Sequence, residues 1–392
     1  MRWVSAISDL DDTARALDAV SKQVVDQLEG EQPHLLLVFS SPDHAPEWDD
    51  LPSGLLDRLG GMALVGCSGG GVIGGGREIE QRAALAVAAA VLPDVAITTM
   101  HLEVSQLPEQ TADWHERLGF GPDEDPCFVL MPDPFAFDPE ACIQSLDEAY
   151  PNATKIGGLA SGGILPRTNA IFVDRTCHRS GASLLALRGN IQLDPIIAQG
   201  CRPVGETMLV TSCDGHVIHG LDSRLPGEVL EALHESLDDE DRELVRDSLF
   251  MGVEMRDQRE YRAGDFLIRN IVGMQADGRA LAVAALVSRW QAVQFHLRDR
   301  RAATEDLERQ LNGYAATGVD PAPAGALLFS CLGRGEQLYG VAGHDTDAFV
   351  DKLGDLGLTG FFGNGEIGPV GERTYLHGYT SAFGVFRPKR CN

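Results

Sequence analysis

The stretch Ala324–Thr380 carries the pattern that decides the fold of this chain. It begins with the apolar run Ala326-Leu327-Leu328-Phe329, continues through Ser330-Cys331-Leu332-Gly333-Arg334-Gly335, and later reaches Gly363-Asn364-Gly365-Glu366-Ile367-Gly368. The apolar run predicts a buried strand, and the residues between the two glycine-rich segments predict a helix and a second strand. Glycines at this density let backbone amides approach a small ligand closely. The stretch therefore predicts a strand–helix–strand unit with a candidate ligand site at its turns.

The same pattern recurs upstream. Leu55–Gly66 aligns without a gap on Phe349–Gly360, and Val38–Ser41 corresponds to Leu328–Cys331. A third version extends over 128–158, from an apolar run through a helical segment to Ile156-Gly157-Gly158. Such similarity predicts an internal repeat of one structural unit, and it supports a fold more than a function.

The first copy and the C-terminal copy differ at two positions whose side chains could take part in chemistry. Cys331 stands where the first copy has Ser41, and Glu366 stands where it has Val72. Replacing a carboxylate by valine removes both a charge and its acceptor oxygens while leaving a glycine turn intact. We therefore expect ligand-binding chemistry in the C-terminal half.

Bulk composition argues against several classes of partner and site. The 392 residues are enough for two or three domains, and a formal charge of −26 argues against binding nucleic acid or an anionic membrane surface. The eight cysteines never form a C-x-x-C pair, which argues against a zinc cluster or a disulfide scaffold. The chain shows no apolar signal core and no run of transmembrane length. We expect a cytoplasmic protein with no metal, no cofactor and no membrane insertion.

Hydrophobic periodicity predicts the remaining elements. Helices are expected at 11–29, 51–59, 138–149, from Pro226, from Asp238 and at 299–316. Strands are expected at 34–39, 63–66, 127–131, 154–158, 170–173, 182–187, 265–272, 280–287 and 292–297, with a hairpin at 208–219. A domain boundary is expected close to Gly205.

A literal G-x-G-x-x-G occurs at Gly69, Gly71 and Gly74, directly after a predicted strand. This spacing is typical of dinucleotide-binding loops, which open a helix. The segments 83–91 and 95–102 can equally form a hairpin of two apolar strands. Dinucleotide binding through Gly69–Gly74 therefore stays a lesser alternative.

Several motifs together resemble the FIST family of bacterial sensory domains. The motifs are Gly66-Cys67-Ser68, Gly157-Gly158, Gln199–Gly205, Gly264–Arg269, Phe295–Asp299, Phe329–Gly335, Gly363–Pro369 and Leu376-His377. With the strand–helix–strand rhythm, this resemblance implies an α/β (mixed α+β) fold of two related layered domains, each of mixed β-sheets covered by helices. The N-terminal domain would be 1–205 and the C-terminal domain 206–392.

The resemblance also implies a function. FIST domains are described as sensing small ligands, with amino acids or related metabolites proposed, so we expect small-molecule binding without an established reaction. No output segment is recognisable, so any signal would pass through a separate protein partner. The sequence departs from the family at Gly71-Val72-Ile73, where a Gly-Glu-Ile like that at 365–367 is usual.

Arg334 and Glu366 are the leading ligand-binding candidates. An arginine fork binds a carboxylate and a carboxylate binds an ammonium, so the pair would recognise a free amino acid. Alternatively the two side chains pair with each other and tie two loops together. The other candidate ligand-binding residues are Gly335, Asn364, Gly365, Cys331, His377 and Arg298.

A catalytic alternative uses Cys331 as the nucleophile of a hydrolase or transferase. His377 would be its base, and the amides of Gly333–Gly335 would form an oxyanion hole. A small buried thiol without reactivity is the simpler interpretation of Cys331. A third possibility is a scaffold that binds only a protein partner.

Overall fold

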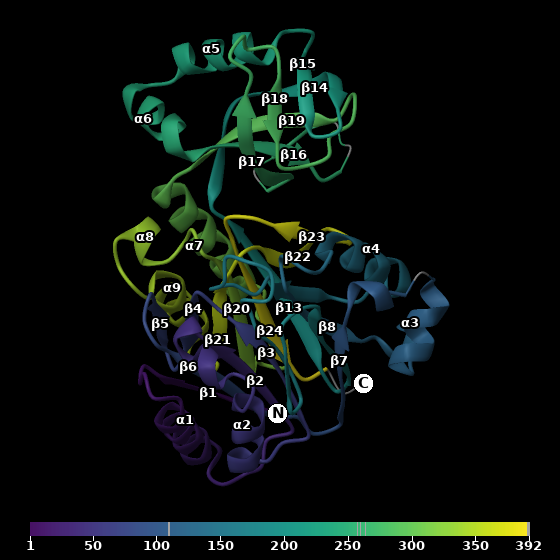
Figure 1. The fold of residues 1–392 in the computed structure, drawn as a ribbon, viewed down its shortest axis with the longest axis vertical. Helices are drawn as coiled ribbons and strands as arrows, with labels where there is room; N and C mark the ends of the chain where they lie inside the picture. Colours follow the sequence, from purple (N-terminus) through teal and green to yellow (C-terminus); the bar gives the residue numbers. More distant parts are fainter. Residues whose placement is uncertain (109, 257, 259, 263, 390–392) are drawn as a thin grey trace. The chain divides into compact units, whose positions relative to one another are not determined.

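The structure of the chain is a computed structural model that describes residues 1–108, 110–256, 258, 260–262 and 264–389. Cys391, one of the eight cysteines, lies outside the described residues. The chain forms two compact units. The three-sheet unit comprises Met1–Ala198, Leu307–Leu376 and Thr380–Asn392, and the barrel unit comprises Gln199–Asp306 and His377–Tyr379 (Figure 1).

The three-sheet unit contains three six-stranded mixed sheets. The first, in spatial order, is β1(Arg2–Ser8), β6(Leu85–Val91), β2(Leu35–Ser40), β3(Ala63–Ser68), β10(Ile171–Val173) and β11(Thr176–His178). The second is β7(Val95–Leu102), β12(Ala182–Gly189), β8(Cys127–Pro132), β9(Lys155–Gly158), β22(Glu366–Val370) and β23(Arg373–His377). The third is β13(Gln192–Gln199), β24(Thr380–Arg387), β20(Gly325–Cys331), β21(Thr359–Gly363), β4(Gly71–Gly74) and β5(Arg77–Glu80).

All three sheets share one strand order. Each has a central parallel pair, β2 with β3, β8 with β9 or β20 with β21, and an antiparallel strand beside the first member of the pair. The hairpin that follows each pair crosses to the next sheet: β4–β5 joins β21, β10–β11 joins β3, and β22–β23 joins β9. Each hairpin therefore completes a sheet other than the one its own pair forms.

A glycine occupies the same position in each parallel pair. Gly66 lies opposite Val38, Gly157 opposite Leu130 and Gly360 opposite Leu328. A Cβ added to Gly66, Gly157 or Gly360 would lie 1.9, 1.8 or 1.7 Å from the facing carbonyl oxygen. These distances are too short for any side chain. The parallel pairs therefore require glycine at these positions.

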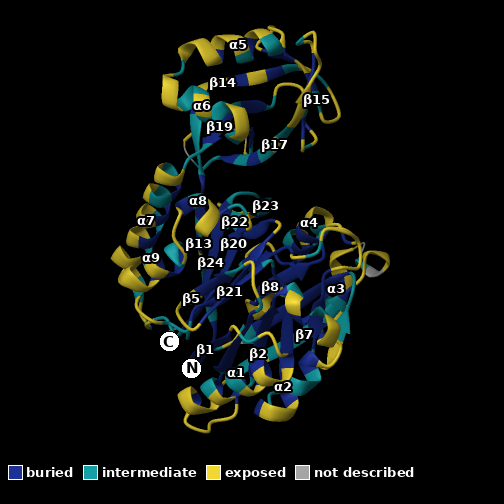
Figure 2. Ribbon diagram, turned by 60° about the vertical axis from the view of Figure 1, so that its left-hand side comes forward, coloured by how far each residue is buried: buried dark blue, intermediate teal, exposed yellow. Residues whose placement is uncertain are grey.

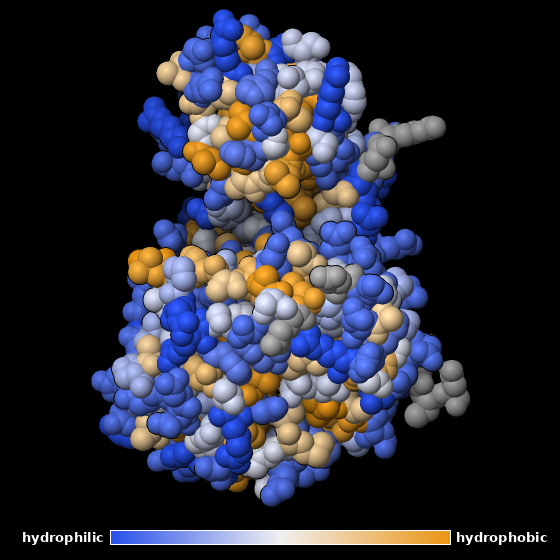
Figure 3. Space-filling model, turned by 45° about the vertical axis from the view of Figure 1, so that its right-hand side comes forward, coloured by the Kyte–Doolittle hydropathy of each residue, from blue (hydrophilic) through white to orange (hydrophobic). Residues whose placement is uncertain are grey.

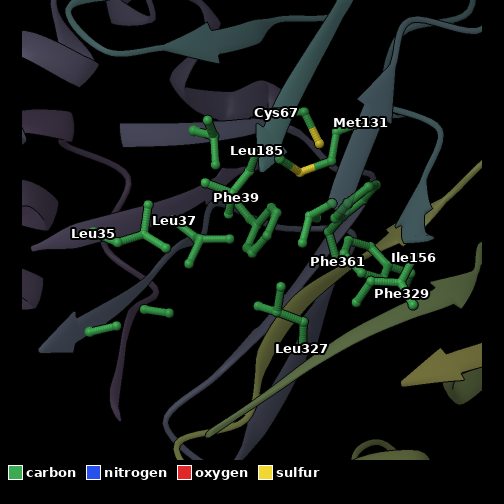
Figure 4. Close-up of a cluster of buried hydrophobic side chains, with 14 of the residues drawn as sticks. Leu35, Leu37, Phe39, Cys67, Met131, Ile156, Leu185, Leu327, Phe329 and Phe361 are labelled. Carbon is green, nitrogen blue, oxygen red and sulfur yellow. The ribbon is translucent and has the colours of Figure 1, made fainter. Parts of the chain in front are cut away.

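The inner faces of the three sheets share one hydrophobic core. Alternate residues of β2, β8 and β20 enter this core, and the residues between them face the helices. Figure 4 shows Leu37, Phe39, Met131, Phe329 and Phe361 from the three sheets pointing toward one another. Because both faces of these strands are buried, their sequences are continuous apolar runs.

Helices cover the outer face of each sheet (Figure 2). Apolar residues of α1(Thr13–Leu28) and α2(Leu51–Leu59) pack on the first sheet. Those of α3(Thr111–Leu118) and α4(Pro139–Ala149) pack on the second. Those of α7(Arg300–Ala316) and α9(His344–Leu353) pack on the third, and the short α8(Glu336–Tyr339) precedes α9. Short 3-10 helices lie at Pro42–Glu47, Val104–Gln106 and Pro122–Glu124.

The barrel unit is a closed barrel with its own core. Its strands, in spatial order, are β14(Cys201–Asp214), β15(Val217–Leu221), β18(Leu281–Val283), β17(Phe266–Met274), β16(Leu249–Glu254) and β19(Ala292–Arg298). Helix α5(Pro226–Ser236) contributes the buried side chains of Val229 and Leu233 to that core, and α6(Asp239–Ser248) contributes partly buried apolar side chains.

The mixed α/β class predicted from the sequence is confirmed. The compact units are not consecutive halves of the chain, because β20–β24 return to sheets that begin in the N-terminal part. The division 1–205 and 206–392 therefore stays a prediction about sequence modules. The expected hairpin at 83–102 is wrong: β6 and β7 are strands, but they belong to different sheets.

Candidate functional site

The candidate site forms at the carboxyl end of the β20–β21 pair in the three-sheet unit. Arg334 follows β20, and Tyr339 closes α8. Asp345 lies in the first turn of α9, and Glu366 opens β22 directly after the Gly363–Gly365 turn. Glu78 comes from β5 of the hairpin that crosses from the first copy of the unit. We name these five side chains the Arg334 cluster, and all five are buried.

Asp345 is the centre of the hydrogen bonding. Its carboxylate accepts from Arg334 Nε at 3.0 Å and from Arg334 Nη2 at 3.1 Å. It also accepts from Ser330 Oγ at 3.3 Å and from Ser381 Oγ, and it lies 3.0 Å from His344 Nδ1. This two-pronged arginine–carboxylate contact fixes the orientation of the guanidinium in the buried site.

The Arg334–Asp345 pair stays ionised although both side chains are buried. Burial alone would lower the pKa of Arg334, but the charge and hydrogen bonds of Asp345, together with Tyr339 and Cys331, outweigh burial and raise that pKa above its usual value. Burial alone would raise the pKa of Asp345, but Arg334 and the hydrogen bonds hold it well below its usual range. Each charge is thus stabilised by the other, as buried ion pairs require.

The two glutamates of the cluster behave differently. Burial raises the pKa of Glu366 well above its ordinary value, despite the Thr380 N–H that its Oε2 accepts at 3.1 Å. Burial, together with the Asp345 carboxylate, raises the pKa of Glu78 to about 7. Burial thus favours the protonated form of both glutamates, and Glu78 is close to its midpoint near neutral pH.

Several polar atoms of the cluster are buried and have no hydrogen-bond partner among the described residues. They are Arg334 Nη1, Glu366 Oε1, Glu78 Oε2 and Tyr339 OH. Native proteins leave few buried polar atoms unsatisfied, and each costs about 1–3 kcal/mol. Donors and acceptors without partners thus lie together in one cluster. A small polar ligand with complementary groups would satisfy them.

The structure shows where Arg334 and Glu366 lie and which carboxylate pairs with Arg334. The structure brings both side chains into one cluster, where the Arg334 charge acts on Glu366. Within the described part of the chain, however, the ion pair of Arg334 is with Asp345. The alternative in which Arg334 and Glu366 tie two loops together is therefore replaced by an Arg334–Asp345 pair.

Asn364 and Gly365 connect the glycine turns to one another. Asn364 N donates to Leu159 O at 3.1 Å, and Asn364 Nδ2 donates to Ala160 O at 3.1 Å. Gly365 O accepts from Leu159 N at 2.8 Å. These contacts join the turn after β21 to the turn after β9, and ligand binding by Asn364 and Gly365 stays a prediction.

The other predicted residues are divided between the two units. Cys331 is buried beside Glu366, and Gly335 lies against Glu80 at the start of α8. His377 and Arg298 belong to the barrel unit, so the catalytic pairing of Cys331 with His377 stays a prediction.

Asp345, Tyr339 and Glu78 were not among the sequence candidates. Asp345 and Tyr339 are close to Arg334 in sequence, and Asp345 follows it by eleven positions. This proximity along the chain was the signal that could have suggested them. Glu78 had no such signal, because its place in the cluster depends on the hairpin that crosses between sheets.

The glycine motif at 69–74 takes a structural form that differs from a dinucleotide loop. Gly71–Gly74 is strand β4, which turns into β5 without an intervening helix. A dinucleotide loop needs a helix N-terminus to hold the pyrophosphate. The helix N-terminus that a dinucleotide requires therefore does not follow this motif.

Other site classes have little support. No group of His, Cys, Asp and Glu side chains within the described ranges is arranged to hold a metal ion. No helix in the described part of the chain has the length and apolar character needed to span a membrane. Hydrophilic residues cover most of the face shown in Figure 3, with hydrophobic residues in smaller groups between them.

Three related six-stranded sheets and a separate closed barrel define a mixed α/β protein, and sequence comparison gives the family. Residues 34–224 match the FIST N domain and residues 229–369 match the FIST C domain. The chain belongs to the FIST family, a family of sensory and signalling domains.

Relatives match nearly the whole chain. The uncharacterized protein Rv0628c of Mycobacterium tuberculosis is 33% identical over 387 residues, which cover 98% of this chain and 100% of the relative. The uncharacterized protein Mb0898c of Mycobacterium bovis is 32% identical over 387 residues, which cover 98% of this chain and 99% of the relative. The names of these relatives assign no activity.

One solved structure covers the chain at low similarity. The crystal structure of a cyanuric acid hydrolase from A. caulinodans covers 99% of this chain and 100% of its own, with a TM-score of 0.37 and 8% identity. This similarity is too low to carry an argument about fold or function.

Proposed function

We propose that this FIST-family chain is a cytoplasmic sensory protein that binds a small metabolite, an amino acid or a derivative, in the Arg334 cluster and signals through a separate protein partner. The observation that carries the proposal is the set of buried polar atoms without partners in that cluster. Family membership supports sensing, and the formal charge of −26 supports a partner other than nucleic acid.

The cluster offers complementary groups for the two ends of an amino acid. Arg334 Nη1 is a charged donor that a carboxylate would satisfy while Nε and Nη2 remain on Asp345. Glu366 Oε1 and Glu78 Oε2 are acceptors that an ammonium group would satisfy. A bound ammonium would favour the ionised form of Glu366 and lower its pKa. Binding should therefore release a proton from the cluster.

The position of Glu366 within the fold supports a functional rather than a structural role. Glu366 lies opposite Gly158, and the residues at the same place in the other two hairpins are Val72, opposite Phe361, and Ile171, opposite Cys67. Val72 and Ile171 belong to the central hydrophobic core. We propose that the three sheets arose from one repeated unit, and that Glu366 departs from its apolar counterparts because it contacts a ligand.

Access to the cluster requires movement, because its side chains are buried. The segment 332–343 between β20 and α9 is the natural candidate. Leu332 and Val341 are 36% and 56% exposed, and Gly335, Gly340 and Gly343 have positive φ angles. A short segment with glycines at its turns can open as a lid without unfolding the sheet. Its closed position is held by Glu336 N, which donates to Glu80 Oε1 at 2.9 Å.

The test is a thermal-shift screen of the full chain against the twenty L-amino acids, followed by calorimetry on any amino acid that raises the melting temperature. Glu366→Gln is the informative variant because it keeps an acceptor for Thr380 N–H and removes the ionisable group. Glu372→Gln, an exposed position in the turn between β22 and β23, is the matched control.

The proposal expects a response in wild type and in Glu372→Gln but not in Glu366→Gln. An amino acid that stabilises wild type and Glu366→Gln equally would move the site elsewhere. A complete lack of response at millimolar concentration would favour a scaffold that binds only a protein partner.

A further inference from the structure

A concave site lies within the barrel unit. It has a cavity volume of about 430 Å³ and is formed by the end of α6, by β16, β17 and β19, and by Tyr379. Its size falls within the range of small-molecule pockets. Since every residue of its wall belongs to the barrel unit, this cavity is distinct from the Arg334 cluster.

The wall of the cavity is rich in donors. Arg246 and Arg298 line it together with a single acidic residue, Asp247. Tyr379 OH donates to Asn270 Oδ1 at 2.6 Å, and both side chains belong to the cavity wall. In a chain of formal charge −26, a cavity with two arginines and one aspartate is a local positive site. Such a set of donors selects an anion.

The aromatic part of the wall orients one of the arginines. The Arg298 guanidinium lies 5.2 Å from the centre of the Tyr379 ring, within the range of a cation–π contact. Phe250 packs on the same ring, with centroids 4.3 Å apart. Arg298 is therefore held by a planar contact that lysine could not reproduce equally well.

The backbone at Tyr379 is held in a costly conformation. Its φ of 62° is in the left-handed region, which costs a non-glycine residue about 1–2 kcal/mol. The Tyr379 carbonyl accepts from Gly200 N at 3.0 Å, which fixes this conformation. Strain of this kind concentrates at ligand sites, where it places a side chain that a relaxed backbone would point elsewhere.

We propose that this cavity binds a small organic dianion, in which two negative charges meet Arg298 and Arg246 and a short apolar body rests on Leu249 and Ile271. A phosphomonoester and a dicarboxylate share this chemistry. Both apolar side chains line the cavity and are partly exposed, so they offer the body a surface that is now in contact with water. The inference is independent of the function proposed for the Arg334 cluster.

The test is titration calorimetry of the full chain at low salt with phenyl phosphate in one arm and glutarate in the other. At least one of the two is expected to bind, and the tighter arm identifies the kind of anion. Arg298→Gln and Arg246→Gln should each weaken that binding at least tenfold. Arg246 is exposed at the end of α6, so this variant tests the site without affecting a buried contact.

Two control variants distinguish anion binding in this cavity from general electrostatic attraction to the protein. Arg279→Gln changes the net charge equally and lies outside the cavity wall, so it should bind as wild type does. Glu366→Gln should also bind as wild type does, whatever the fate of the amino acid proposal. The inference is overturned if neither anion binds with a dissociation constant of about 1 mM or lower, or if Arg279→Gln weakens binding as much as Arg298→Gln.

Discussion

Glu78 makes the stability of the Arg334 cluster depend on pH. Its Oε1 accepts from Thr346 N at 2.8 Å, its Oε2 has no partner among the residues described, and burial with the nearby Asp345 carboxylate raises its pKa. The folded protein therefore binds this proton more tightly than the unfolded chain. The stabilisation is fully present below the ordinary pKa of 4.5 and is lost as the pH rises through about 7.

The magnitude follows from the two pKa values. A rise from 4.5 to about 7 corresponds to about 3 kcal/mol, since each pKa unit is worth about 1.4 kcal/mol. Glutamine has the same shape and does not titrate, so Glu78→Gln removes this dependence. The unfolding free energy of wild type minus that of Glu78→Gln should fall by about 3 kcal/mol between pH 4.5 and 8.

Guanidinium unfolding followed by tryptophan fluorescence is a suitable assay. Trp3, Trp48 and Trp114 are buried in the three-sheet unit, whereas Trp290 of the barrel unit is 58% exposed. The signal therefore reports mainly on the unit that contains Glu78. Glu372→Gln, at an exposed position, should give a flat difference. A flat or rising difference for Glu78→Gln would refute the assignment of a raised pKa to Glu78.

Three further predictions concern the fold and the cluster. Asp345→Asn should lower the unfolding free energy by about 3–5 kcal/mol because it leaves the Arg334 charge buried without its partner, whereas the surface change Asp351→Asn should cost under about 1 kcal/mol in the same denaturant assay. Gly157→Ala should prevent folding, seen as loss of near-ultraviolet circular dichroism, because its Cβ would lie 1.8 Å from Leu130 O, while Gly313→Ala in α7 meets no atom within 4 Å and should stabilise by about 0.5–1 kcal/mol. Amino acid binding should lower the raised pKa of Glu366 and release a proton, so the calorimetric heat should change with the ionisation heat of the buffer, and a heat that is the same in phosphate and Tris would contradict a raised pKa of Glu366.

The local pattern of the chain was predictable from the sequence. The helix expected at 51–59 is α2, the helix expected at 138–149 is α4 from Pro139, and the strand expected at 34–39 is β2 from Leu35. These elements have strong apolar periodicity and clear end signals, such as the Asp138 side chain that accepts from Ala141 N. Local sequence was sufficient because local contacts and burial agree.

The arrangement of the sheets was not predictable in the same way. β1 and β13 are outer strands of two sheets, and neither was predicted from the sequence. The crossing of hairpins between sheets depends on contacts far apart in the chain. Pairing of β4 with β21 joins residues near 72 to residues near 361, and no local pattern encodes that contact.

The candidate site was predictable in part for the same reason. Arg334 and Glu366 stand in glycine-rich turns with a distinctive sequence, and the structure places both in one buried cluster. The counter-ion of Arg334 was misjudged, since Asp345 is the carboxylate that occupies the arginine fork. Glu78 could not be found from sequence, because it reaches the cluster only through the crossing hairpin.

The central claim is that the Arg334 cluster binds a small metabolite through Glu366. Calorimetric titration of wild type and Glu366→Gln with the amino acid that gives the largest thermal shift is the most direct test. Wild type should bind the amino acid with a measurable heat, and Glu366→Gln should show almost no binding while remaining folded. Equal affinities of wild type and Glu366→Gln would contradict the claim.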